Sequence, residues 1–251
     1  MTAEPPLPAR PGDTPARPGV TPARPAAAPV RTAPATTTPV TTTPVPAAAT
    51  VPAAATAATG RAPGPQAGDR VAIRPETAQD HEGVHLLHTR AFGDDGRVSR
   101  LVEALRGARA GAGPLSFVAV LDGAVVGHVL LSGCRLDAPR RIVDVLSLSP
   151  LGVLPEHQGR GIGTRLVRHA LAAAEDTGAP LVFLEGDPGW YRTRGFEPAT
   201  PAGFRSPSLR IPGPAFQVAR LSAHEPWMTG TFVYSEPFWA LDCVGLRDPE
   251  A

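Results

Sequence analysis

The chain has 251 residues, a formal net charge of +1 and two cysteines. Its length allows one or two domains. The balanced charge argues against a surface for nucleic acid or anionic membranes. Cys134 and Cys243 are too few for a disulfide framework, and no apolar run reaches the length of a membrane span. We therefore expect a soluble cytoplasmic protein that binds neither nucleic acid nor membrane.

Residues 1–69 differ in composition from the rest of the chain, because they hold 16 of its 31 prolines. The tetrapeptide Pro-Ala-Arg-Pro recurs at positions 8, 15 and 22. Proline excludes a helix, and few bulky apolar side chains are present to offset the entropy cost of ordering. We expect a disordered tail rich in Pro, Ala and Thr. A folded domain over residues 70–221 should follow, with a C-terminal extension over residues 222–251 packed on it.

The domain begins with a predicted strand at residues 71–74. Thr77 and Asp80 are typical of the start of a helix, and apolar residues then follow at helical spacing as far as Ala91. A second amphipathic segment follows at residues 98–105. The spacing therefore predicts two helices after the first strand.

The first of these helices contains a zinc-like pattern, since residues 81–85 read His-Glu-Gly-Val-His. Glu103 would be the third ligand of such a site. However, Gly83 weakens the helix by about 1 kcal/mol relative to Ala, and Glu103 lies on a separate amphipathic segment at a loose spacing. We favour a solvated histidine stripe, keep a zinc hydrolase as the least favoured alternative, and expect no metal.

A hairpin and a further strand come next. Residues 115–121 and 124–131 read as two strands joined by an Asp-Gly turn. The following strand, from Ile142, contains Pro150, which should interrupt its hydrogen-bond ladder. Backbone groups beyond Pro150 would then be free to pair with an extended ligand.

This strand leads into a glycine-rich turn and an amphipathic helix. Gly159, Gly161 and Gly163 precede apolar residues that recur every three or four positions, until Gly178 ends the helix. The free amide groups at such a helix start attract phosphate. The chain contains no Lys, which excludes a Walker loop, and the G-x-G-x-G spacing does not match a dinucleotide fingerprint.

After this helix, residues 180–185 read as a buried strand. The strand–helix–strand unit predicts a parallel pair with a right-handed crossover, and a ligand belongs beyond the carboxyl ends of its strands. A turn leads to a short helix at residues 190–195, and residues 215–221 form a final core strand. The aromatic-rich segment 225–241 is predicted to pack on the core, with a wall of the acceptor pocket as the less favoured alternative.

Two motifs resemble those of the GNAT superfamily of acetyl-CoA-dependent N-acyltransferases. Residues 158–163 read Gln-Gly-Arg-Gly-Ile-Gly and are similar to its Q/R-x-x-G-x-G/A motif. Residues 185–196 resemble its second hallmark, with Tyr191 five residues before the Phe of a Gly-Phe pair. Together with residues 230–238, these motifs look like the YhbS-like branch of predicted acetyltransferases, over residues 71–240.

The resemblance implies an α/β (α+β) fold, in which a mixed, mostly antiparallel sheet flanked by helices is splayed in a V between its fourth and fifth strands. Acetyl-CoA would lie in the V. Leu151, Gly152 and Val153 would pair with the pantetheine through backbone groups, and Tyr191 would protonate the departing CoA thiolate. The pyrophosphate would be held at the glycine-rich turn by Gln158, Gly159, Arg160, Gly161, Ile162 and Gly163, with Thr164 next to them.

The activity that the resemblance implies is acetyl transfer from acetyl-CoA to a primary amine by direct attack. The acceptor, a small molecule or a peptide, is mostly ammonium at neutral pH and needs a base. Glu185, at the end of its strand, is the candidate, with a solvated carboxylate as the equal alternative; Asp144 and Glu156 are weaker candidates. A non-catalytic acyl-CoA sensor or interaction module is the alternative function, and a homodimer is left open.

Overall fold

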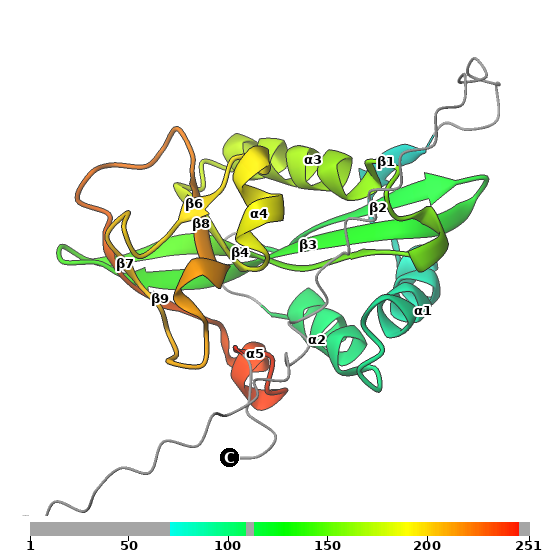
Figure 1. Ribbon diagram of the computed structural model, residues 1–251, viewed down its shortest axis with the longest axis horizontal. Coiled ribbons are helices and arrows are strands. Elements are labelled where there is room, and N and C mark those ends of the chain that lie inside the picture. Colours follow the sequence, from blue (N-terminus) through cyan, green and yellow to red (C-terminus); the bar gives the residue numbers. More distant parts are fainter. Residues whose placement is uncertain (1–70, 109–112, 246–251) are drawn as a thin grey trace, which may run out of the picture. The chain divides into compact units, whose positions relative to one another are not determined.

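The structure, a computed structural model, describes residues 71–108 and 113–245. The predicted tail at residues 1–69 therefore lies outside the described residues. The described chain forms a nine-stranded sheet with helices on both faces (Figure 1). The strands are β1 (Ala72–Pro75), β2 (Leu115–Leu121), β3 (Ala124–Asp137), β4 (Ile142–Val153), β5 (Leu181–Glu185), β6 (Glu197–Pro198), β7 (Phe204–Arg205), β8 (Phe216–Arg220) and β9 (Gly230–Val233). The α-helices are α1 (His81–Phe92), α2 (Arg97–Arg106), α3 (Ile162–Asp176), α4 (Pro188–Tyr191) and α5 (Glu236–Ala240).

The sheet is mixed and mostly antiparallel, as predicted. Its main path runs β1-β2-β3-β4-β5-β8-β6, and β9 pairs with β3 and β7. Within the described residues, only the β4–β5 and β7–β9 pairs are parallel. The β4–β5 ladder joins Leu146 to Val182 and Ser147 to Phe183 and goes no further. The two strands diverge beyond it, which confirms the predicted V; we call this divergence the splay.

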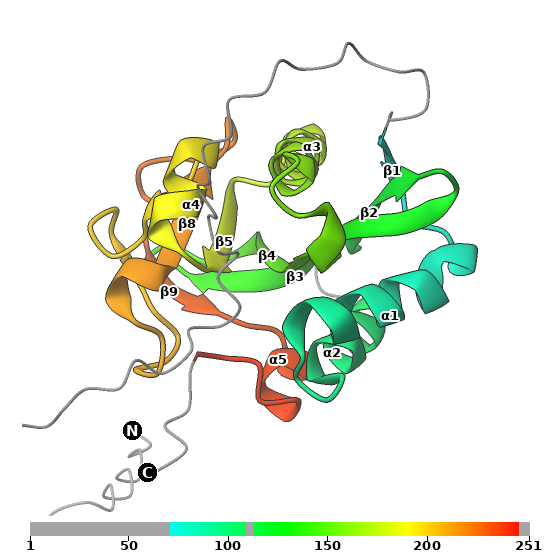
Figure 2. The ribbon, with the colours of Figure 1, turned by 45° about the vertical axis from the view of Figure 1, so that its right-hand side comes forward.

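Helix α3 covers one face of the sheet, and α1 and α2 cover the other (Figures 1 and 2). The apolar stripe of α3 packs on the sheet as its spacing predicts, through Ile162, Leu166, Val167, Ala170 and Ala174. On the opposite face Leu101 and Leu105 of α2 join a second buried cluster. Burying each such leucine stabilises the fold by about 1.5–3 kcal/mol, so both layers hold the sheet in place. None of the helices in the described ranges combines the length and the apolar character needed to cross a membrane.

Pro150 interrupts the β3–β4 ladder, as predicted. Val129 pairs with Leu151 and Leu131 pairs with Leu148, so Ser149 and Pro150 together oppose one residue of β3. The Ser149–Pro150 peptide bond is cis. The extra residue in β4 makes a β-bulge, which bends the strand and changes the direction of the residues that follow. Strand β3 is longer than predicted and reaches Asp137, because its second half pairs with both β4 and β9.

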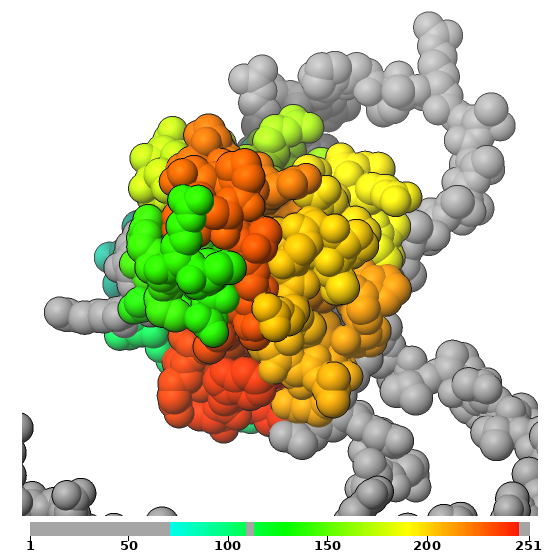
Figure 3. Space-filling model, turned by 90° about the vertical axis from the view of Figure 1, so that its left-hand side faces the viewer, coloured from blue at the N-terminus to red at the C-terminus, as the bar shows by residue number. Residues whose placement is uncertain are grey.

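Strand β9 comes from the segment beyond residue 221 and lies within the sheet. Phe232 pairs with Leu136 of β3, and its ring stacks on Phe183 of β5 at a centroid distance of 4.5 Å. Gly230 has a φ of +138°, and a Cβ there would collide with the carbonyl oxygen of Asp137. Figure 3 shows this end of the domain, where the β3–β4 turn (green) lies against the C-terminal segment (orange and red). Residues beyond 221 therefore contribute a strand as well as a packed helix.

Candidate active site

The end of β4 carries the backbone groups predicted to pair with a ligand. Leu151, Gly152 and Val153 pair with β3 along one edge. On their other edge, where β5 has diverged, they have no strand partner in the described part of the chain. Gly152 lies under α1, where a Cβ would approach the His88 ring to within 2.9 Å. The structure thus leaves one edge of this segment open for an extended ligand.

The glycine-rich turn follows a short 3₁₀-helix, Pro155–His157, and leads into α3. Gly159 and Gly161 have φ values of +73° and +76°, which glycine adopts without steric cost. Apart from the adjoining residues of the chain, no atom of the described residues lies within 4 Å of the position a Cβ would take at either glycine. The outer side of the turn is therefore open, next to the first amides of α3, which lack intrahelical partners. This arrangement can bind a phosphate.

Side chains of the turn have different surroundings. Gln158 Nε2 donates a hydrogen bond of 3.0 Å to the carbonyl of Val153, so this side chain fastens the turn to β4. Arg160 is exposed, and Thr164 Oγ1 accepts a hydrogen bond of 2.9 Å from Arg194 Nε. Arg194 brings a fixed positive charge to the start of α3, which the sequence analysis missed. Its guanidinium also lies 3.7 Å from the ring centroid of Trp190.

Tyr191 lies at the end of α4, just beyond β5. Asp187 caps this helix by accepting a hydrogen bond of 2.9 Å from Gly189 N. The Tyr191 ring contacts Trp190 and Phe196, and its hydroxyl has no hydrogen-bond partner within the described ranges. Burial raises the pKa of the Tyr191 phenol, so it remains protonated at neutral pH. The phenol therefore keeps its proton, which it would need in order to act as the predicted acid.

Glu185 lies at the carboxyl end of β5 but is not a solvated carboxylate. Its Oε1 accepts a hydrogen bond of 2.8 Å from Tyr234 Oη, and its Oε2 accepts one of 3.0 Å from Gly245 N. Burial raises the pKa of Glu185, while these two hydrogen bonds oppose the rise. The Glu185 side chain faces the core on the α2 side, whereas Tyr191 packs on the α3 side. The two predicted catalytic residues thus flank the end of β5 from opposite faces.

The weaker candidates for a base lie in surface ion pairs. Asp144 lies 3.1 Å from Arg135 with 60% of its side chain exposed, and Glu156 lies 3.1 Å from Arg90. In the zinc-like pattern His85 Nδ1 lies 3.2 Å from Glu103 Oε1, and both side chains are exposed. Residues 71–108 and 113–245 contain no group of three or more His, Cys, Asp or Glu placed to hold a metal ion.

A buried histidine pair lies beside Gly152. His88 Nε2 and His128 Nδ1 are 2.8 Å apart, and both side chains are fully buried. Burial lowers the pKa of His88 well below its usual value, with His128 acting in the same direction. Burial also lowers the pKa of His128, although the nearby carboxylate of Glu76, 3.7 Å from its Nε2, opposes the change. The pair is therefore neutral in the folded protein at pH 7.

Because of this pair, we expect the stability of the fold to decrease already at mildly acidic pH, above the range in which carboxylates titrate. Below about pH 6.5 the unfolded chain takes up protons on His88 and His128 that the folded chain does not. The free energy of unfolding should therefore fall between pH 7 and pH 5, by about 2 kcal/mol for each histidine that stays neutral in the folded chain. Urea unfolding at fixed pH values measures it. His81→Gln, which removes an exposed histidine of the same helix, should keep this dependence, and a flat curve in the wild type would contradict it.

The comparisons with known proteins agree with this geometry. The family described as "Acetyltransferase (GNAT) domain" matches residues 72–199. The uncharacterized N-acetyltransferase YjhQ of Escherichia coli (strain K12) is 33% identical over 133 residues, which cover 51% of this chain and 71% of that protein.

Two solved structures share the fold. The Escherichia coli GNAT family N-acetyltransferase YhbS, in complex with CoA, has a TM-score of 0.62 and 30% identity, covering 69% of this chain and 94% of that one. A GNAT family acetyltransferase from Brucella melitensis, in complex with acetyl-CoA, has a TM-score of 0.55 and 31% identity, covering 68% and 99%.

Proposed function

The chain belongs to the GNAT acetyltransferase family, and from this premise we propose that it transfers the acetyl group of acetyl-CoA to a primary amine by direct attack. One observation carries the proposal: the open edge of β4 meets the open glycine turn at the start of α3. A ligand with an extended amide chain and a pyrophosphate needs both features side by side. The complexes of the two solved relatives with CoA and acetyl-CoA support this choice of co-substrate.

The proposed cofactor contacts follow the order of the chain. Leu151, Gly152 and Val153 pair with the pantetheine amides along the open edge of β4. The amides from Gly159 to Thr164 hold the pyrophosphate, since the turn is open there and the helix start favours negative charge. Arg194 adds a cation at the same helix start. Gln158 contributes by fastening the turn to β4, and the exposed Arg160 adds charge at the rim.

The proposed chemistry assigns an acid and a base to the two sides of β5. Glu185 removes a proton from the acceptor ammonium, because burial raises the pKa of its carboxylate and makes it a better base than an exposed one. The free amine attacks the thioester carbonyl, the C–N bond forms and the C–S bond breaks. Tyr191 donates its proton to the departing thiolate. The acceptor is a small-molecule or peptide amine.

A turnover screen tests this function. Full-length protein is incubated with acetyl-CoA and one amine from each of several classes, and free CoA thiol is measured with time. We expect thiol release that depends on one class of primary amine, and mass spectrometry should find the acetyl group as an amide on that amine. Binding of acetyl-CoA without thiol release in any class would instead favour the sensor function.

A further inference from the structure

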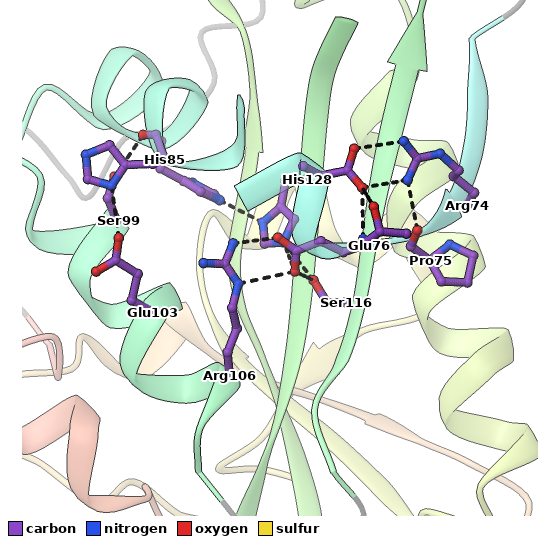
Figure 4. Close-up of polar contacts among 12 residues, drawn as sticks. Arg74, Pro75, Glu76, His85, Ser99, Glu103, Arg106, Ser116 and His128 are labelled. Atoms are coloured by element: carbon purple, nitrogen blue, oxygen red, sulfur yellow. Dashed lines mark hydrogen bonds and ion pairs between the residues drawn. The ribbon is translucent and has the colours of Figure 1, made fainter. Parts of the chain in front are cut away.

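A line of polar contacts crosses the sheet beneath α1 (Figure 4). Arg106 Nη2 on α2 lies 2.5 Å from Glu76 Oε1, and Ser116 Oγ on β2 donates to Glu76 Oε2 at 2.5 Å. His128 Nε2 on β3 lies 2.8 Å from Ser116 Oγ. His88 Nε2 on α1 lies 2.8 Å from His128 Nδ1. We call Glu76, Ser116, His128 and His88 the relay.

The carboxylate of Glu76 fixes the direction of every hydrogen bond in the relay. Because Ser116 donates its proton to Glu76, its oxygen accepts from Nε2–H of His128. His128 then presents a bare Nδ1, which accepts from Nε2–H of His88. The remaining nitrogen, His88 Nδ1, therefore carries a lone pair and no proton. It is buried and has no hydrogen-bond partner among the described residues.

The relay runs strand by strand toward the splay. Ser116 lies on β2 and His128 on β3, where His128 is paired with Gly152 of β4. A Cβ on Gly152 would lie 2.9 Å from His88 Nδ1, so only a glycine leaves space beside this buried nitrogen at β4. The next strand in the sheet is β5, from which β4 diverges. The bare nitrogen thus lies at the last strand before the splay.

We propose that His88 is a proton acceptor for acetyl transfer, and that His128, Ser116 and Glu76 hold its tautomer and stabilise the charge it gains. The proposal rests on the proposed function, because it concerns the same reaction. In catalytic groups of this kind an ionised carboxylate orients an imidazole without taking the proton itself. The relay has that arrangement, extended by one hydroxyl and one further imidazole.

The reaction releases two protons from the acceptor nitrogen, so a second proton acceptor is needed besides Glu185. An ammonium acceptor loses two protons before it becomes an amide nitrogen, and the CoA sulfur takes up one. Glu185 takes the first proton, and after the C–N bond forms the second passes through one water to His88 Nδ1. The C–S bond then breaks as Tyr191 protonates sulfur. Of the two protons held by Glu185 and His88, one returns to Tyr191 and the other leaves to solvent.

The charges around His88 suit this role. Burial lowers the pKa of His88, and His128, Arg106 and His85 act in the same direction, while Glu76 opposes them. The imidazole is therefore neutral at pH 7 and can accept a proton. Burial of Glu76 alone would raise its pKa, but the nearby His128 and the hydrogen bonds from Arg106 and Ser116 lower it to about 2. Glu76 thus stays ionised, and its negative charge stabilises the positive charge that the histidine pair gains with a proton.

Nitrogen-15 NMR of the histidine rings tests the geometry without any substrate. In the full chain at pH 7, both His88 and His128 should be neutral Nε2–H tautomers, assigned by comparison with spectra of His88→Gln and His128→Gln. Addition of acetyl-CoA should shift the Nδ1 signal of His88, and the signals of exposed His81 should stay in place. A proton on Nδ1 of His88, or a charged His88 at pH 7, would overturn the proposal.

Kinetics with an amine that the wild type acetylates test the role. His88→Gln keeps a donor for His128 but cannot gain a proton, so kcat should fall about 100-fold with the KM for acetyl-CoA unchanged. The fall should be smaller at high pH, where hydroxide can take the second proton in place of His88. His81→Gln is the matched control, two turns earlier on the same helix and exposed. Absence of wild-type turnover would overturn both proposals, whereas equal activity of the two variants would overturn only the role of His88.

Discussion

Tyr191→Phe is expected to lower turnover by about 100-fold or more while leaving acetyl-CoA affinity and the melting temperature little changed. The substitution keeps the ring, which contacts Trp190 and Phe196, and removes only the hydroxyl. That hydroxyl has no partner in the described part of the chain, so its loss leaves no buried group unpaired. Steady-state rates of thiol release and calorimetric binding of acetyl-CoA measure the two effects.

The chain's other tyrosine provides a contrast. Tyr234 Oη donates to Glu185, so Tyr234→Phe should act through the base. It should raise the pKa of Glu185 further and move the acidic limb of the pH–rate profile to higher pH. Tyr191→Phe should lower the rate without moving that limb. If Tyr191→Phe keeps turnover within a few-fold of the wild type, the phenol is a packing residue and the assignment of the acid is wrong.

Gly161→Asp is expected to weaken acetyl-CoA binding by about 100-fold. It would place a negative charge beside the proposed pyrophosphate, and like charges about 4 Å apart near a protein surface repel by a few kcal/mol. Gly161 has a φ of +76°, and apart from its chain neighbours no atom of the described residues lies within 4 Å of its Cβ position. The cost in stability should therefore be confined to backbone strain of about 1–3 kcal/mol. Calorimetry measures the affinity, and urea unfolding measures the strain.

Gly178→Asp is the matched control for this variant. Gly178, at the other end of α3, has a φ of +74° and equally open surroundings. The same substitution there should cost similar stability and leave acetyl-CoA binding unchanged. Equal affinities of the two variants would show that the pyrophosphate does not bind at the start of α3.

The turn and helices of the site could be predicted from the sequence because their causes are local. Gly159 and Gly161 occur where the backbone has positive φ, and the spacing from Ile162 onward sets the face that α3 buries. Pro150 marks its bulge for the same kind of reason, since a residue without an N–H interrupts the ladder wherever it lies. The motif around Tyr191 likewise forms a capped turn within a few residues of Asp187.

Contacts between distant residues were decided only by the tertiary structure. The sequence predicted Glu185 at a strand end, but not that Tyr234 and Gly245, 49 and 60 residues later, donate hydrogen bonds to it. Residues 230–233 read as part of a packed extension, yet they form a strand because β3 extends far enough to pair with them. Their pairing depends on long-range register, which no local spacing encodes.

The glycine turn and the histidine pair of the site differ in the same way, because the turn depends on local sequence and the pair depends on tertiary contacts. The sequence by itself determined a glycine turn that opens a helix, because φ and periodicity are properties of neighbouring residues. Only the packing of α1 against the sheet brought His88 to His128, 40 residues away, and both to Gly152. A histidine in an amphipathic helix reads as a solvated or a core residue until its partner is known. The protonation state and the hydrogen bonds of such a histidine depend on its partner, and the packing of α1 against β3 determines which residue that partner is.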